Sequence, residues 1–362
     1  MPWPDRRILD LFRIDLPILQ APMAGASTPE MAIAVSEAGG LGSLPCAQYD
    51  LAGARAALEQ VRAGTGRPIN VNSFCHTMPE RSEAEETRWR ARLAGYYREM
   101  GLDPDMPFPA GGRTPFDETF CALIEEARPE VASFHFGLPE PALLRRVKAS
   151  GAKVIASATT VREAKWLEER GCDAVIAMGF EAGGHRGNFL SEDPSGDMTR
   201  QGGTFALVPQ VVDAVKVPVI AAGGIGDARG IVAALALGAA AVQIGTAYLF
   251  CPEAKIPAYH RAALRSAADD DTMVTNLFTG RPARGIANRI MREVGPLSSD
   301  APSFPLAGGG LIPLRKVSEA KGSGDFSNMW AGQAVRLGVE TPAGDLTRKL
   351  ASEALKRLAR PG

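Results

Sequence analysis

The run Asp173-Ala174-Val175-Ile176-Ala177-Met178 is followed, two residues later, by Glu181-Ala182-Gly183-Gly184-His185-Arg186-Gly187. A short apolar run that ends near glycines is typical of a strand buried on both faces, as in a parallel sheet. Glycines after such a strand let the backbone come close to a ligand. We therefore predict a ligand-binding loop in which His185 and Arg186 both reach the ligand. A tight turn that carries two surface side chains is the alternative.

Short apolar runs alternate with helical patterns along most of the chain. Eight runs qualify as strands: 17–20, 41–44, 68–73, 131–136, 153–157, 173–178, 217–222 and 240–245. Stretches rich in Ala, Leu, Glu and Arg lie between them, and four of these stretches end at the helix stop signals Gly39, Gly151, Gly171 and Gly238. Eight strand-helix units predict an α/β fold, a (β/α)8 TIM barrel, with a doubly wound sheet as the alternative.

Two segments break this alternation. Residues 76–116 are polar at first and then rich in Pro and Gly, which predicts a helical excursion after the third strand. From residue 252 onward helical patterns replace strands, and residues 298–313 have the Pro, Ser and Gly content of a loop. We therefore expect a barrel at 1–251, with an insertion at about 76–116, and a helical C-terminal subdomain at 252–362 that covers the barrel mouth.

The composition limits the classes of partner. The 362 residues carry a formal net charge of -1 and a pI near 6.5, which gives no electrostatic basis for binding nucleic acid or an anionic membrane. The longest apolar stretch is too short to span a bilayer, and the N-terminus lacks the apolar segment of a secretory signal. We expect a cytoplasmic protein that acts on small molecules as a monomer or homodimer.

Cysteine and histidine spacing argues against a metal site or a disulfide framework. The five cysteines form no CxxC pair. No two of the four histidines stand three or four residues apart, so a preformed helical metal site is not expected.

Residues that follow the predicted strands converge on one pocket if the fold is a barrel. Ala21-Pro22-Met23 follow the first strand, where Pro22 stiffens the turn and Met23 offers a soft apolar contact for a flat ring. Asn72 ends the third strand and can bond the edge of a heterocycle, with a turn cap as the alternative. Alternation along residues 131–136 places His135 in the barrel mouth, with a core histidine as the alternative.

Glycine-rich loops follow the last two predicted strands. Ala221-Ala222-Gly223-Gly224-Ile225-Gly226 leaves strand seven, and Gln243-Ile244-Gly245-Thr246 leaves strand eight. In TIM barrels, loops at these places hold a phosphate with backbone N–H groups at helix N-termini. The sequence therefore predicts a ligand that carries a phosphate.

Several motifs resemble, in order and spacing, those of the nitronate monooxygenase family, formerly called 2-nitropropane dioxygenases. Within that family the chain is similar to the bacterial class acting on propionate 3-nitronate. The matching segments are Gln20-Ala21-Pro22-Met23-Ala24-Gly25 with Ser27-Thr28-Pro29, Asn70-Val71-Asn72 with Phe74-Cys75-His76-Thr77, Ser133-Phe134-His135-Phe136-Gly137, 181–187, 221–224, 243–246, 279–285 and 330–333. The resemblance covers most of the chain.

The resemblance implies a barrel that binds FMN non-covalently and oxidises alkyl nitronates with O2 to a carbonyl compound and nitrite. It implies that the phosphate is held by Gly223, Gly224, Gly245 and Thr246, and that the cofactor also contacts Ala21, Pro22, Met23, Asn72, Met178, Gly183, Gly184 and Gln243. The catalytic residues that it implies are His185 and His135. A positioning role suits His135, whereas His185 is suited to act either as a base or as a hydrogen-bond donor.

Four positions depart from the family pattern. Met178 stands where a glutamine is expected, which removes a hydrogen-bond donor to the flavin. Phe304, Gly308 and Ile312 stand in a loop where the family offers tyrosine, more polar residues and often a lysine. These changes predict a more apolar pocket and a less charged or bulkier substrate than propionate 3-nitronate.

Two other functions stay open. An FMN-dependent, NAD(P)H-linked enoyl-thioester or quinone reductase resembles this family in its barrel, its cofactor and its glycine-histidine loop. No feature of the sequence indicates a site for NAD(P)H. The second alternative is a flavin-binding homologue whose departures from the family pattern have altered or abolished nitronate turnover.

Overall fold

All eight predicted apolar runs form strands of one parallel sheet. In the computed structural model, which describes residues 2–109 and 113–359, these strands are β1 (Ile18–Gln20), β2 (Gly42–Pro45), β3 (Ile69–Phe74), β4 (Val131–His135), β5 (Lys153–Ala158), β6 (Ala174–Met178), β8 (Val219–Ala222) and β9 (Ala241–Ile244). The sheet order is β1-β9-β8-β6-β5-β4-β3-β2. Bonds from Gln20 N to Leu41 O and from Leu41 N to Ile18 O, both 3.0 Å, join the two edges. The TIM barrel is therefore confirmed, and the doubly wound alternative is wrong.

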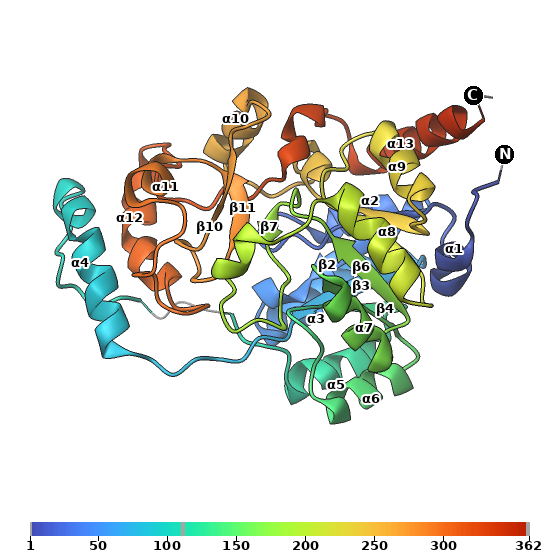
Figure 1. Cartoon of the computed structure of the whole chain (residues 1–362), viewed down its shortest axis with the longest axis horizontal. Helices are drawn as coiled ribbons and strands as arrows, with labels where there is room; N and C mark the ends of the chain where they lie inside the picture. The colour runs from blue at the N-terminus through green and yellow to red at the C-terminus, as the bar shows by residue number, and fades with distance from the viewer. Residues whose placement is uncertain (1, 110–112, 360–362) are drawn as a thin grey trace.

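Helices cover the outside of the barrel (Figure 1). After the short α1 (Arg7–Phe12) they are α2 (Pro29–Glu37), α3 (Leu51–Gly64), α5 (Glu118–Ala127), α6 (Pro141–Ala149), α7 (Val161–Glu169), α8 (Thr204–Ala214) and α9 (Ala228–Ala236). Local sequence sets their ends: the Thr28 side chain accepts a bond from Met31 N at the start of α2, where Pro29 is the first residue. The predicted stop glycines all have left-handed φ angles: Gly39 +95°, Gly151 +98°, Gly171 +89° and Gly238 +92°.

The last helix of the chain belongs to this outer layer. α13 (Ala343–Leu358) packs against α2 and α9, and its residues Leu346 and Leu350 are buried in the barrel core. Figure 1 shows α13 in red beside α9, near the N-terminus. The division at residue 251 stays a prediction, but residues 343–358 pack on the barrel helices rather than over the mouth.

The predicted insertion and the C-terminal segment share a second hydrophobic core. From the insertion, α4 (Glu83–Glu99) contributes Trp89 and Tyr97, and from the C-terminal segment α12 (Gly308–Ala320) contributes Leu311. Tyr97 OH donates to Gly310 O (2.7 Å). In Figure 1 α4 (cyan) lies beside α12 at the end of the molecule farthest from both termini. Residues 110–112 of the predicted insertion, residue 1 and residues 360–362 lie outside the described residues.

A small antiparallel sheet, which the sequence did not predict, links the C-terminal segment to the loop after β6. Its order is β10-β11-β7, with β10 (Thr272–Thr275), β11 (Ala283–Ile286) and β7 (Gly184–His185). The predicted helices of this segment are present as α10 (Ala258–Ser266), α11 (Arg289–Val294) and α12. Strands of two to four residues carry too little periodicity to be recognised without their partners.

α12 begins inside the stretch 298–313 that was predicted to be a loop. The prediction is wrong from Gly308 onward, because the glycines there serve a close contact between helices. A Cβ atom on Gly310 would lie 2.8 Å from Trp89 Nε1 and 2.9 Å from Leu93 Cδ1. The ring of Trp89 is itself fixed, since its Nε1 donates to Ala307 O (3.0 Å).

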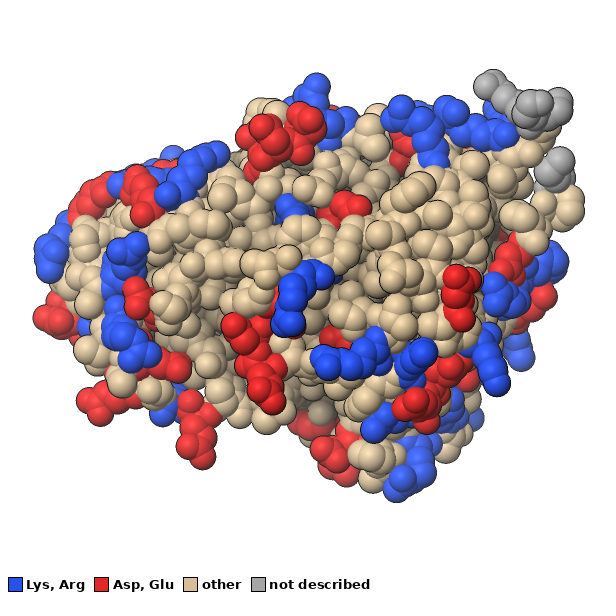
Figure 2. All heavy atoms as spheres, viewed as in Figure 1, with Lys and Arg blue, Asp and Glu red and all other residues tan. Residues whose placement is uncertain are grey.

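Acidic and basic side chains are interspersed over the face drawn in Figure 2. That face therefore offers no extended surface of one sign, of the kind that binds nucleic acid. Among the described residues, no helix has the length and apolar character needed to cross a membrane.

We predict that Gly310→Ala destabilises the protein by about 1–3 kcal/mol, because the added methyl group overpacks α12 against the fixed ring of Trp89. Gly95→Ala in α4 is the matched control. A Cβ atom there meets nothing within 4 Å, so removal of a mid-helix glycine should stabilise by about 0.5–1 kcal/mol. Urea unfolding of both variants measures the difference, and an unchanged midpoint for Gly310→Ala would contradict the packing role.

Candidate active site

A cavity of about 620 Å³ opens at the carboxyl ends of the barrel strands. Its lining includes the catalytic and cofactor-binding residues that the family resemblance implies: Ala21, Pro22, Met23, Asn72, His135, Met178, Gly183, Gly184, His185, Gly223, Gly224, Gln243, Gly245 and Thr246. These residues come from loops separated by more than two hundred positions, and the barrel brings them together. Their individual roles stay predictions.

Backbone forms one wall of the cavity. Gly223 and Gly224 follow β8 with φ angles of +109° and +69°, a conformation that other residues rarely adopt. A Cβ atom on Gly223 would lie 2.9 Å from Thr204 Oγ1, whose hydroxyl donates to Gly223 O at 2.9 Å. A side chain at either glycine would therefore strain the wall, and a ligand here meets main-chain atoms.

Two amide side chains line the same cavity. Asn72 Nδ2 donates to Ser133 Oγ (3.0 Å), which fixes the orientation of its amide. Gln243 Oε1 is buried and has no hydrogen-bond partner within the described residues. A buried polar atom without a partner is costly, so this oxygen is suited to receive a bond from a ligand.

The loop after β6 is held tightly against the C-terminal segment. Gly184 and His185 form β7, which pairs with Arg284 and Ala283 of β11. A Cβ atom on Gly183 would lie 2.5 Å from the backbone nitrogen of Gly332. Glycine is required at position 183 because two backbone segments meet there.

Arg186 does not reach the cavity, so the prediction that both polar side chains of this loop contact the ligand is wrong for the arginine. Its side chain is fully buried and donates to Met178 O (2.8 Å), Gly179 O (2.5 Å) and Gln201 Oε1 (2.8 Å). Burial lowers the pKa of Arg186 to about 10, which still leaves it charged at pH 7. The guanidinium therefore holds the end of β6 in place.

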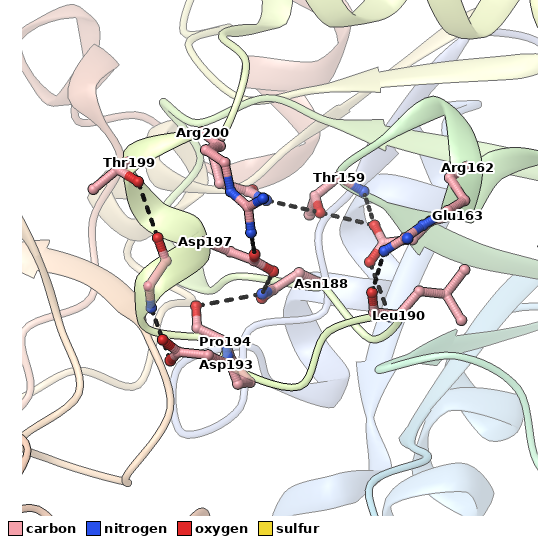
Figure 3. Close-up of polar contacts among 12 residues, drawn as sticks. Thr159, Arg162, Glu163, Asn188, Leu190, Asp193, Pro194, Asp197, Thr199 and Arg200 are labelled. Carbon is pink, nitrogen blue, oxygen red and sulfur yellow. Dashed lines mark hydrogen bonds and ion pairs between the residues drawn. The ribbon is translucent and has the colours of Figure 1, made fainter.

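The chain beyond the loop has its own anchor, shown in Figure 3. Glu163, on the first turn of α7, is buried and accepts bonds from Phe189 N (2.7 Å) and Thr159 N (2.7 Å). Asn188 Nδ2 donates to Asp197 Oδ2 (3.2 Å). These bonds fix residues 188–197 and thereby the C-terminal side of the histidine loop.

His135 lies in the barrel mouth as predicted, with both ring nitrogens occupied. Nε2 is 3.2 Å from His185 O and Nδ1 is 2.6 Å from Ser157 Oγ. A carbonyl oxygen only accepts, so Nε2 carries the proton and Nδ1 accepts from the Ser157 hydroxyl. Burial, with a smaller contribution from the charge of Arg281, lowers the pKa of His135 to about 3. His135 is therefore a neutral residue that positions the loop.

Of the two histidines with a predicted catalytic role, His185 is the one with a ring nitrogen that has no hydrogen-bond partner among the described residues. Its Nε2 is 3.0 Å from Thr279 Oγ1, and that hydroxyl is 3.3 Å from Arg281 O. When the Thr279 hydroxyl donates to the Arg281 carbonyl, the hydroxyl oxygen accepts a hydrogen bond from His185 Nε2–H. Nδ1 of His185 then carries a lone pair and has no partner among the described residues. Burial, followed by nearby His135 and Arg113, holds the pKa of His185 well below 6.5.

The four departures from the family pattern lie in different places. Met178 lines the cavity, and Phe304 packs its ring 5.4 Å from that of His185. Gly308 and Ile312 lie on α12 outside the cavity lining, and Ile312 is 37% exposed. The expectation that these two positions make the pocket more apolar is therefore wrong.

Several lining residues were not found from the sequence. They are spread over the insertion and the C-terminal segment: Arg113, Lys255, Tyr259, His260, Arg315, Asn328 and Trp330. Trp330 belongs to a matched motif, and its ring lies 5.5 Å from that of His185. The others follow no strand of the barrel and carry no spacing signal, so that only the fold reveals them.

Comparisons with known proteins agree with one another. Residues 5–353 match the family model described as nitronate monooxygenase. Nitronate monooxygenases of Paraburkholderia phytofirmans and Pseudomonas aeruginosa are each 41% identical to this chain. Each match covers 96% of this chain, together with 94% of the Paraburkholderia protein and 98% of the Pseudomonas protein. The crystal structure of nitroalkane oxidase from Streptomyces ansochromogenes is 40% identical to this chain, with a TM-score of 0.88, and the match covers 98% of this chain and 99% of that one. FabK from Thermotoga maritima is 28% identical, with a TM-score of 0.73 over 97% and 96%. This chain, with a barrel, a cavity and a histidine loop of this kind, belongs to the nitronate monooxygenase family of oxidoreductases.

Proposed function

We propose that this chain binds FMN in the cavity and uses O2 to oxidise alkyl nitronates to a carbonyl compound and nitrite. The observation that carries the proposal is that the unpartnered amide oxygen of Gln243, the backbone wall at Gly223 and Gly224, and both histidines line one cavity of about 620 Å³. That volume lies in the usual range for a cofactor site. Membership of the family supports the reaction class.

The residues present fit FMN. Gly223, Gly224, Gly245 and Thr246 would hold the phosphate with backbone N–H groups, as loops at this place in a TIM barrel do. Gln243 and Asn72 would bond the polar edge of the flavin ring, and Met23 would contact its face. Met178 removes one amide from this set but adds no charge or bulk that excludes a ring. FMN, when bound, accepts electrons from the substrate and passes them to O2.

The protein's own contribution is to position and shield the substrate. Phe74, Phe304 and Trp330 surround the His185 ring, at centroid distances of 6.0, 5.4 and 5.5 Å, and reduce its contact with water. The neutral imidazole of His185 can then take a proton from the carbon of a neutral nitroalkane through Nδ1. The name nitroalkane oxidase of the Streptomyces relative supports use of that neutral form. A nitronate, which has already lost this proton, needs no base.

We predict that Gln243→Leu weakens FMN binding about fivefold to thirtyfold, the effect of one hydrogen bond worth about 1–2 kcal/mol. Gln210→Leu is the matched control, because Gln210 is on α8 at the surface and bonds only its own helix at Ala206 O. Quenching of FMN fluorescence on titration into the apoprotein measures the dissociation constant. Equal affinities for the two variants would remove Gln243 from the cofactor site.

We predict that His185→Gln slows oxidation of neutral nitroethane by about 10²–10⁴-fold and affects preformed ethyl nitronate far less, because only the neutral form needs a base. The depressed pKa of His185 keeps the imidazole neutral below pH 6.5, so wild-type kcat/KM for nitroethane should stay level from pH 8 to 6.5 and fall only at lower pH. Equal losses for both substrates, or a fall with a midpoint at 6.5 or above, would contradict the base role.

Oxygen uptake by the FMN-loaded protein tests the function as a whole. We expect rapid uptake with a nitronate alone, from a panel that includes propionate 3-nitronate, and formation of nitrite. The similarity to FabK makes NADH and NADPH the necessary parallel donors. Uptake only with NAD(P)H would favour the reductase alternative, and no uptake with any donor would favour a flavoprotein that has lost nitronate turnover.

A further inference from the structure

We propose that Arg113 is the anion-recognition residue of this cavity, binding an oxyanion of the substrate through its guanidinium group. The identity of the substrate as a nitronate rests on the proposed function. The role of Arg113 in binding an oxyanion rests on geometry and charge alone.

The backbone around Arg113 is fixed against the end of β3. Arg113 O is 2.9 Å from His76 Nε2, and Phe116 N donates to Phe74 O at 2.7 Å. Its guanidinium Nη1 donates to Ala47 O at 3.0 Å, the one hydrogen bond that the guanidinium makes to the described residues. The half-buried side chain lines the cavity together with Phe74, His135 and His185.

Within the part of the chain that the structure describes, Arg113 has no acidic partner. Among the described residues, no Asp or Glu oxygen lies within 4.0 Å of its guanidinium nitrogens. A guanidinium has five N–H donors, so Arg113 keeps several for a ligand. Burial lowers its pKa from the ordinary value, as expected for a cation that has lost part of its hydration without gaining a counter-charge. An anion bound in the cavity would compensate the guanidinium for its lost hydration.

The other cations near the cavity are less suited to this role. Arg315 is paired with Glu319 at 3.3 Å, and Lys255 is exposed. Arg281 lies outside the lining, stacked 4.3 Å over the ring of Phe136. His135 and His185 are neutral, and the positive charge of Arg113 contributes to lowering the pKa of His185. Among the cations that line the cavity, Arg113 is therefore the one that is partly desolvated and has no acidic partner within the described residues.

A planar guanidinium binds planar oxyanions with two parallel hydrogen bonds, which suits a nitronate group and a carboxylate equally. The substrate class is an anionic nitronate, bound either through the nitronate oxygens or through a second anionic group on the same molecule.

Binding of inert anions tests this without turnover. Succinate has the size and the two charges of propionate 3-nitronate, and butyrate lacks the second charge. By titration calorimetry on the FMN-loaded protein, we expect Arg113→Gln to raise the dissociation constant of succinate tenfold or more, and Arg113→Lys to restore part of the affinity. If Arg113→Gln loses as much affinity for butyrate as for succinate, the guanidinium binds the carboxylate that the two molecules share. If it loses affinity for succinate alone, the guanidinium binds the second carboxylate.

Arg92→Gln is the matched control, because it removes one positive charge from exposed α4, where Arg92 bonds only Val294 O (2.9 Å). Thermal midpoints of all variants exclude misfolding as the cause. The proposal is overturned if wild-type protein binds neither anion, if Arg113→Gln binds both as tightly as wild type, or if Arg92→Gln shows the same loss. Lost succinate binding in a protein whose wild type oxidises no nitronate would refute the proposed function and leave the anion site standing.

Discussion

A buried guanidinium fixes the loop on which the cavity depends. Arg186 is fully buried, and its donors are taken up by the carbonyls of Met178 and Gly179 and by the amide oxygen of Gln201. A charge removed from water is tolerated only where its hydrogen bonds are made in good geometry, so these contacts define one arrangement of the chain. His185 is the preceding residue, and the direction of its ring follows from that arrangement.

The cavity is not a property of the barrel alone. The C-terminal segment supplies β11, which pairs with β7, the Thr279 hydroxyl beside His185, and the close contact of Gly332 with Gly183. That segment is in turn packed against α4 of the insertion through the core around Trp89. Two excursions from the barrel therefore build one structure that completes the site, although residues 117–251 separate them in the chain.

The sequence predicted the barrel and the members of the cavity because both depend on local patterns. Apolar runs and stop glycines are visible residue by residue, and strand ends converge in a closed barrel whatever their separation in sequence. It could not separate His185 from Arg186, because the pairing of His185 with β11 and the burial of the Arg186 side chain are both tertiary contacts. Tertiary contacts alone reveal the roles of Gly310 and Arg113. In the sequence Gly310 has the character of a loop residue, and Arg113 follows no strand.

In the proposed mechanism, proton transfer and charge neutralisation are carried out by different residues, His185 and Arg113. An imidazole enclosed by Phe74, Phe304 and Trp330 loses hydration, which disfavours its charged form and leaves it a proton acceptor. The enclosure that makes His185 neutral also weakens the screening of any charge beside it, so a cation in the same cavity attracts an anion more strongly than it would in water. Arginine is the residue suited to that second task, because its guanidinium stays protonated under desolvation that neutralises histidine. Burial lowers the pKa of both side chains, but it leaves His185 neutral and Arg113 charged because the ordinary pKa of a guanidinium is far higher than that of an imidazole.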